Sequence, residues 1–193
     1  GNEQPFVADF ATTTAANGKL AILQRKNLDT PHGWVQTKTG EPSTNAAEVK
    51  NGGALLPLGG DREHGSHKGY MLGSIVDIFS AVLSGANYGP WVPPFPAYVA
   101  MPENMPGEGI GHFFGAMRID AFRTVEEFKL NMDNWIQRFS NAKTIAGESK
   151  VIIPGEPERE MEIIRMKEGI PLIKPVVNDL IELGKNLNIP FIL

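Results

Sequence analysis

The stretch Leu58-Gly-Gly-Asp-Arg-Glu-His-Gly-Ser-His-Lys-Gly-Tyr-Met-Leu72 is a glycine-rich polar loop that leads into the most apolar helix-period segment of the chain. The pattern downstream predicts a helix that begins at Lys68 or Gly69 and ends near Gly85, a typical C-terminal capping residue. The predicted buried face of this helix consists of Leu72, Ile75, Val76, Phe79, Val82 and Leu83. We therefore expect a buried helix at the centre of the fold.

The start of this helix is a candidate anion site. The first amides of an α-helix lack carbonyl partners within the helix, and the helix dipole places its positive end there. His67 and Lys68 add donors and positive charge at this end. Such a helix start suits phosphate. A plain structural turn with solvated charges explains the same composition.

Length and composition exclude several classes of protein. A chain of 193 residues favours a single domain over residues 1–193. The net charge is −4, without a cluster of lysine and arginine, which argues against nucleic acid as a partner. No apolar run approaches the roughly 20 residues that a membrane span needs, so we expect no membrane partner. The absence of cysteine removes thiolate chemistry and fits a reducing, cytoplasmic location.

The remaining elements alternate between strand-like and helical segments, which favours a layered α/β domain. Residues 6–10, 112–120 and 151–156 are predicted strands, and the last of them ends at a turn. Residues 27–53 read as a turn-rich excursion with one or two short strands. Residues 87–111 are rich in proline, glycine and aromatic side chains, Phe95 and Tyr98 among them. They predict an irregular segment that is either an interface arm or lid, or a plain surface excursion.

Three helices are predicted in the last third of the chain. Thr124 and Glu127 form a capping box for the first, whose apolar face consists of Val125, Phe128, Met132, Trp135, Ile136 and Phe139. The second begins at Glu156 and stops at Gly169. The third begins near Pro175 and is expected to bury Val176, Val177, Leu180, Ile181 and Leu187.

Other chemistry has weaker support in the sequence. The phosphate-loop pattern Gly-x-x-x-x-Gly-Lys-[Ser/Thr] is absent, and the glycines of residues 107–111 precede a predicted strand instead of opening a helix. A metal hydrolase using His64 and His67 would need further ligands from elsewhere, so we expect no metal. His112 is expected to be a core histidine. Glu156 lies at a strand-to-helix turn, where an acid can read a ribose diol or simply complement the helix dipole.

Five ordered motifs resemble the malate/L-lactate dehydrogenase family that includes sulfolactate, ureidoglycolate and diketogulonate dehydrogenases. They are Asp9-Phe-Ala-Thr-Thr-Thr14, Pro57-Leu-Gly-Gly60 with His67-Lys-Gly69, Leu83-Ser-Gly-Ala86, Gly111-His-Phe-Phe114, and Pro154-Gly-Glu156 with Gly169-Ile-Pro171. The resemblance covers nearly the whole chain, and the chain corresponds to the larger C-terminal part of the family sequence. It implies a three-layer α/β/α fold with a mixed sheet, of the non-Rossmann, sulfolactate dehydrogenase-like type.

The resemblance also implies an NAD- or NADP-dependent oxidoreductase that acts on a small 2-hydroxy acid/2-oxo acid pair as a homodimer. The cofactor-binding residues carried over by motif are Asp9, Phe10, Ala11, Thr12, Thr13, Thr14, Ala15, His67, Lys68, Pro154, Gly155 and Glu156. The proton-transfer histidine and the substrate-binding arginine of the family lie upstream of these motifs. None of the four histidines stands in that motif, so we predict no catalytic residue and no activity for this chain alone.

Two points stay open in the sequence. A 2′-phosphate could be read by Arg25, by Lys26 or by nothing in this chain, so the sequence does not choose between NAD and NADP. The rival class is a non-catalytic nucleotide- or anion-binding module, a pseudoenzyme used for assembly.

Overall fold

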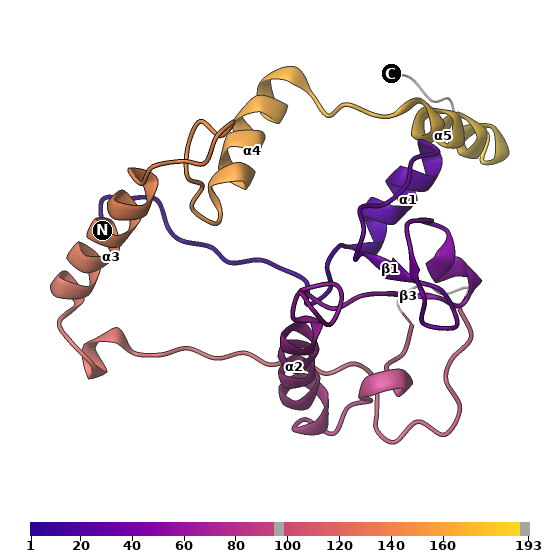
Figure 1. Ribbon diagram of the computed structural model, residues 1–193, viewed down its shortest axis with the longest axis horizontal. Coiled ribbons are helices and arrows are strands. Elements are labelled where there is room, and N and C mark those ends of the chain that lie inside the picture. The colour runs from indigo at the N-terminus through magenta and orange to yellow at the C-terminus, as the bar shows by residue number, and fades with distance from the viewer. Residues whose placement is uncertain (95–98, 190–193) are drawn as a thin grey trace. The chain divides into compact units, whose positions relative to one another are not determined.

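The computed structural model describes residues 1–94 and 99–189 (Figure 1). The chain divides into two compact units. Unit 1 contains Gly1–Asp9 and Met117–Leu193, and unit 2 contains Phe10–Ala116. The single domain expected from chain length stays a prediction. The expectation of an irregular segment at Phe95 and Tyr98 falls outside the described residues.

Unit 2 combines short strands with two longer helices. Its elements in chain order are α1 (Asn17–Arg25), β1 (Val35–Gln36), β2 (Pro42–Ser43), the 3-10 helix η1 (Glu48–Asn51), β3 (Ala54–Leu55), α2 (Ser66–Asp77), the π-helical turn η2 (Ile78–Val82) and the 3-10 helix η3 (Gly89–Trp91). The strands form an antiparallel sheet in the order β2-β1-β3. Val35 of the central strand lies opposite Ser43 on one side and Leu55 on the other.

The core of unit 2 lies where α1 covers this sheet. Leu20, Val35 and Ala46 are buried together. The partly buried residues that pack against them are Leu23, Trp34, Val49 and Leu55. The turn-rich excursion predicted for residues 27–53 is confirmed, because β1 and β2 are its two short strands.

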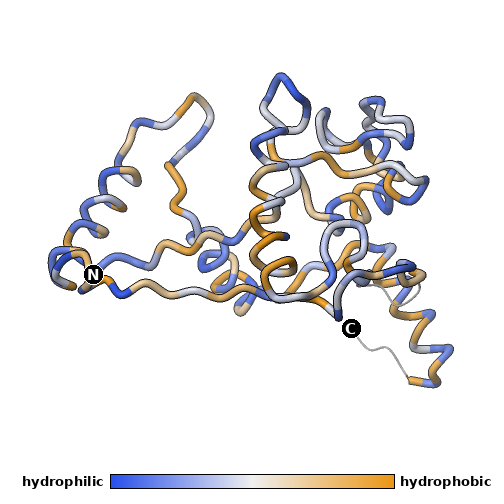
Figure 2. The backbone as a smooth tube through the Cα atoms, turned by 90° about the horizontal axis from the view of Figure 1, so that it is seen from below, coloured by the Kyte–Doolittle hydropathy of each residue, from blue (hydrophilic) through white to orange (hydrophobic). Residues whose placement is uncertain are grey.

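The helix predicted after the glycine-rich loop is confirmed, but its burial is not. It begins at Ser66, two or three residues earlier than expected. After α2 ends at Asp77, the π-helical turn η2 continues to Val82, ahead of Gly85 with φ +80°. Figure 2 shows the run of apolar residues along this helix. Five members of the predicted buried face are exposed, and Leu83 is 68% exposed. Helical periodicity identifies an apolar face but not what covers it, and the core of unit 2 lies elsewhere.

Unit 1 is helical in its described part. Its elements are the 3-10 helix η4 (Ile119–Ala121), α3 (Val125–Ser140), α4 (Glu156–Glu168) and α5 (Lys174–Asn186). The predicted capping box is confirmed, since Glu127 N donates to Thr124 Oγ1 and Thr124 N to Glu127 Oε2. Gly169, with φ +80°, ends α4 as predicted. The expected burial of the apolar residues of α5 is wrong, because none of them is buried. Ile136 is the buried member of the predicted apolar face of α3.

The N-terminal segment begins beside α3 within unit 1 (Figure 1). The amides of Asn2 and Glu3 donate to the buried Asp133 carboxylate over 2.7 and 3.1 Å, and these two bonds lower the pKa of Asp133. Phe6 stacks edge-on against Trp135 at a centroid distance of 5.7 Å. The Asp133 carboxylate and this aromatic pair therefore help to hold the start of the chain against α3.

The three predicted strands outside unit 2's sheet are wrong. Residues 6–10, 112–118 and 151–153 are extended or irregular, residues 119 and 120 belong to η4, and residues 154 and 155 form a turn. A strand needs a ladder of backbone hydrogen bonds, whereas a single bond, from Val7 N to Pro154 O at 3.0 Å, joins the first and last of these segments. His112, expected in a core, is exposed and stacks on Phe114. The chain is of the α/β class.

Candidate functional site

The predicted threonine run is fixed against the segment that precedes the glycine-rich loop in unit 2. Thr14 N donates to Leu56 O over 2.9 Å, and Leu58 N donates to Thr12 O over 3.0 Å. The residues between them face each other in an antiparallel bridge. The Thr14 hydroxyl also donates to Leu56 O, at 3.2 Å. This pairing sets the position from which the loop departs.

Two glycines allow α2 to lie directly against this pair of segments. A Cβ on Gly69 would lie 2.8 Å from Leu58 Cα, and a Cβ on Gly73 would lie 3.3 Å from Thr12 Oγ1. The first distance is too short for any side chain, so residue 69 must be glycine for this approach. The threonine run, residues 56–58 and the first turn of α2 thus form one packed group.

The loop between them folds back on itself. Gly59 has φ +100°, and a Cβ there would lie 2.7 Å from the carbonyl carbon of Gly65. Asp61 Oδ1 accepts hydrogen bonds from His64 N at 2.8 Å and from His64 Nδ1 at 2.6 Å. The backbone bond from His64 is the main reason that the pKa of Asp61 lies below its ordinary value, and the side-chain bond adds to it. His64 is therefore held by Asp61.

The start of α2 offers fewer free amides than expected. Ser66 N donates to Asp61 O over 3.0 Å, and Lys68 N donates to Gly65 O over 2.9 Å. Within residues 1–94 and 99–189, the His67 amide has no hydrogen-bond partner. The Lys68 side chain folds back over Gly65, with Nζ 3.7 Å from where a Cβ on Gly65 would stand. One amide and one ammonium group, on exposed residues, remain available to an anion.

In unit 1, the Pro154-Gly155 turn is held by the side chain of Glu156. Glu156 Oε1 accepts from Lys150 Nζ at 2.9 Å, and Oε2 accepts from Ile153 N at 3.1 Å. The bond from Lys150 is the main cause of the lowered pKa of Glu156. Each carboxylate oxygen therefore already accepts a hydrogen bond within the chain. The role of Glu156 as a cofactor contact stays a prediction.

Three of the predicted residues line one cavity of unit 1. Asp9, Pro154 and Gly155 lie around a space of about 370 Å³. The structure thus brings part of the predicted set together in unit 1 and another part, Thr12 to Thr14 with the start of α2, in unit 2. Phe10 and Ala11 are exposed at the first positions of unit 2, and Ala15 is buried.

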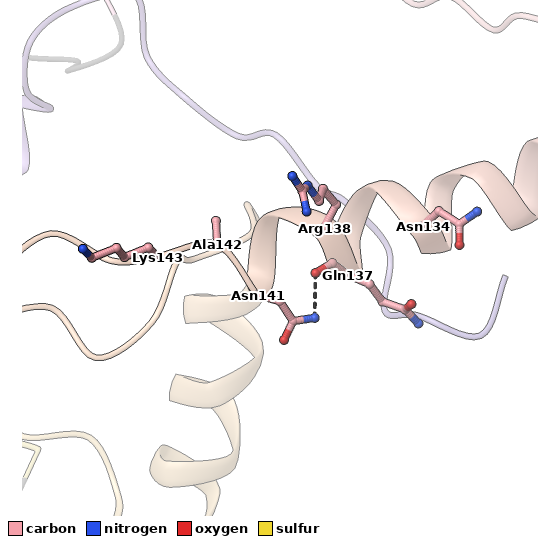
Figure 3. Close-up of a pocket in the computed structure, with 6 residues that line it drawn as sticks. All are labelled: Asn134, Gln137, Arg138, Asn141, Ala142 and Lys143. Atoms are coloured by element: carbon pink, nitrogen blue, oxygen red, sulfur yellow. Dashed lines mark hydrogen bonds between the residues drawn. The ribbon is translucent and has the colours of Figure 1, made fainter.

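A larger hollow of about 550 Å³ lies at the C-terminal end of α3 and contains none of the predicted residues (Figure 3). Its walls include Asn134, Gln137, Arg138, Asn141 and Lys143. Asn141 Nδ2 donates to Gln137 O over 2.8 Å. Arg138 and Lys143 sit where basic residues complement the negative end of a helix dipole, which accounts for them without a ligand.

Sequence reasoning missed Gly73, Lys150 and Arg159. Glycines four residues apart on α2 signal a close helix contact and could have indicated the packing at Gly69 and Gly73. Lys150 pairs with Glu156 across a turn, and Arg159 Nη1 donates over 3.1 Å to Pro5 O, which is distant in the sequence. No local pattern reveals such contacts. Within residues 1–94 and 99–189, no three His, Cys, Asp or Glu side chains gather as metal ligands, and the expectation of no metal stays a prediction.

The family model described as malate/L-lactate dehydrogenase matches residues 1–181. The chain belongs to this family. In the part of the chain that the structure describes, no helix is both long and apolar enough to cross a membrane.

Three relatives show how far the similarity extends. The malate dehydrogenase of Pyrococcus horikoshii is 35% identical over 188 residues, which are 97% of this chain and 50% of the relative. The ureidoglycolate dehydrogenase (NAD(+)) of Escherichia coli O157:H7 is 26% identical over 90% of this chain and 46% of its own length. The solved sulfolactate dehydrogenase of Methanocaldococcus jannaschii is 31% identical with a TM-score of 0.69, covering 98% of this chain and 50% of that one.

The chain spans about half the length of the curated relatives that it matches. Family membership, predicted from the five motifs, is confirmed. That the matched half is the C-terminal one stays a prediction.

Proposed function

We propose that this chain is the cofactor-binding part of a nicotinamide-dependent dehydrogenase that acts on a small 2-hydroxy acid/2-oxo acid pair. The relatives named as malate, sulfolactate and ureidoglycolate dehydrogenases support this substrate class, because all three substrates are 2-hydroxy acids. The relative named with NAD(+) supports a nicotinamide cofactor. The complete enzyme is proposed to be a cytoplasmic homodimer.

The observation that carries the proposal is the packed group at the start of α2. The threonine run pairs with residues 56–58, Gly69 lies against Leu58, and Lys68 and the His67 amide are left available to an anion. A dinucleotide presents a pyrophosphate, which suits an ammonium group and a helix amide. The donor set in unit 2 therefore fits this cofactor.

Roles for the residues of unit 2 follow from these contacts. Lys68 and the His67 amide hold the phosphates, and the Thr12 to Thr14 run is the wall beside them. In unit 1, Asp9, Pro154, Gly155 and Glu156 are proposed as cofactor contacts on the strength of the family motifs alone. When bound, the nicotinamide would supply the hydride.

Proton transfer is the step for which this chain offers no group in the proposed site. His64 is bonded to Asp61, and His112 is stacked on Phe114. His32 and His67 lack the motif that the resemblance requires. We therefore assign no catalytic residue and expect this chain alone to bind cofactor without turning it over.

The three-layer α/β/α, non-Rossmann fold with a mixed sheet is proposed for the complete enzyme, in which both units belong to one domain. The exposed apolar residues of α2 and α3 support this, since faces of this kind are stable when further chain or a second subunit covers them. The described residues supply only a small antiparallel part of such a sheet.

Calorimetric titration of the purified protein with NADH tests the proposal. We expect saturable binding at one site, and no oxidation of NADH when oxaloacetate or another 2-oxo acid is added. Absence of NADH binding would contradict the cofactor role. Oxidation of NADH by a 2-oxo acid would contradict the prediction that this chain lacks a proton donor.

Sequencing the gene upstream of Gly1 distinguishes the dehydrogenase from the rival class. A segment with the family's histidine and arginine supports the dehydrogenase, and a start codon near Asn2 supports a binding module.

A further inference from the structure

The pair Asn17-Gly18 lies in the first turn of α1, and the chain contains one other Asn-Gly pair, Asn51-Gly52. Glycine has no side chain that shields its amide nitrogen from the side chain of the preceding Asn. All four residues are exposed to solvent. Both pairs therefore carry the groups for a reaction within the chain, and the backbone around each pair decides whether it proceeds.

The amide nitrogens of the two glycines differ in their hydrogen bonding. Gly52 N donates to Glu48 O at the end of η1, and Gly53 N donates to the same oxygen over 2.8 Å. Gly18 N has no acceptor anywhere in residues 1–94 and 99–189, as is common for amides of a first helical turn. The Gly18 nitrogen is thus free to act as a nucleophile, whereas the Gly52 nitrogen is held by its hydrogen bond.

The first turn of α1 is also weakly held. Its N-cap residue, Ala16, makes no side-chain cap bond, and the turn contains no acidic residue that would complement the helix dipole. Lys19 N donates to Ala16 O over 3.0 Å and closes the turn. Gly18 lowers the helix propensity, and a Cβ there would meet no heavy atom within 4 Å. This end of the helix therefore frays, and the Asn17 side chain can reach the Gly18 nitrogen.

We propose that Asn17 is a site of spontaneous deamidation, with the backbone nitrogen of Gly18 as the nucleophile. This nitrogen attacks Cγ of Asn17, the bond from Cγ to Nδ2 breaks, and ammonia leaves with the proton that the attacking nitrogen loses. Water then opens the resulting cyclic imide at either carbonyl, which gives aspartate or isoaspartate at position 17. The reaction consumes one water molecule and needs no oxidant, reductant or cofactor.

The two products have opposite effects on α1. Aspartate places a carboxylate in a first turn that lacks one, where it complements the helix dipole. Isoaspartate adds a methylene group to the main chain and disturbs the start of the helix that carries Leu20. Leu20 is buried with Val35 and Ala46, so this product loosens the core of unit 2. Both products add one negative charge.

Incubation of the purified protein at mildly alkaline pH, followed by proteolysis and peptide mass spectrometry, tests the proposal. The peptide with Asn17 should gain the mass difference between an amide and a carboxylic acid at least about fivefold faster than the peptide with Asn51. About this factor is expected when one ordinary hydrogen bond suppresses the reactive form. In guanidinium chloride the two rates should become similar, because each Asn then precedes a glycine without a hydrogen bond.

Gly18→Ala is the matched variant, because its methyl group meets no neighbouring atom and hinders attack by the nitrogen of residue 18. It should slow the mass gain at Asn17 severalfold and leave that at Asn51 unchanged. Equal or faster conversion of Asn51 in the folded protein would overturn the proposal. A difference between the two sites that persists in guanidinium chloride would also overturn it, and so would unchanged conversion of Asn17 in the Gly18→Ala variant.

Discussion

Gly69→Ala is expected to destabilise unit 2 by about 3 kcal/mol, the upper range for overpacking a tight contact. The new Cβ would overlap the carbonyl oxygen of Leu58 and would lie 2.8 Å from the Cα of Leu58. Leu58 cannot easily retreat, because its amide is bonded to Thr12 O and the neighbouring Gly60 N is bonded to Pro57 O. A fall in the urea midpoint of unfolding, followed by circular dichroism, measures the loss.

Gly18→Ala is the matched control, because it makes the same change in a helix of the same unit. A Cβ on Gly18 meets no heavy atom within 4 Å. Alanine raises helix propensity, so this variant should gain about 0.5 kcal/mol. If Gly69→Ala unfolds at the same urea concentration as the unaltered protein, then α2 does not lie against residues 56–58 and the site described here is wrong.

Lys68→Ala is expected to weaken NADH binding by about 10- to 100-fold, the range for losing a hydrogen bond to a charged group. Lys68 is exposed and its side chain bends over Gly65 at the start of α2, so its loss should remove charge without unfolding the protein. Calorimetric titration gives the affinity, and an unchanged melting temperature shows that the fold is retained.

Lys50→Ala, in the 3-10 helix η1, provides the comparison for Lys68. It removes the same charge from an exposed position of the same unit and should leave the affinity for NADH unchanged. Lys68→Arg should recover much of the lost affinity, because it restores a cation. Equal affinities for Lys68→Ala and the unaltered protein would remove Lys68 from the phosphate site.

Local signals in the sequence predicted the helices well. The capping box at Thr124 and Glu127, the stop at Gly169 and the apolar run after the glycine-rich loop all act over a few residues, and all are found in the structure. Burial was predicted poorly, because periodicity reveals an apolar face and not its partner. The face of α2 is exposed for this reason.

The sequence also failed to predict how distant segments pair. Residues 6–10 and 151–153 have strand-like composition, yet they form no ladder. The bond from Val7 N to Pro154 O is the backbone hydrogen bond that links these two parts of the chain. The bridge between Thr13 and Pro57 could not be predicted either, because neither segment carries a sequence signal that identifies its partner. The motifs named the residues of the candidate site, whereas the contacts that hold them, such as Glu156 with Lys150, required the structure.

Hydrogen–deuterium exchange with and without saturating NADH tests the central claim most directly, because it reports on both units at once. The account predicts slower exchange in residues 9–15, 66–69 and 152–156, and no change at the hollow at the end of α3, around Asn134 and Lys143. Protection confined to that hollow, or no protection in any of the three segments, would contradict the assignment of this chain as the cofactor-binding part of the enzyme.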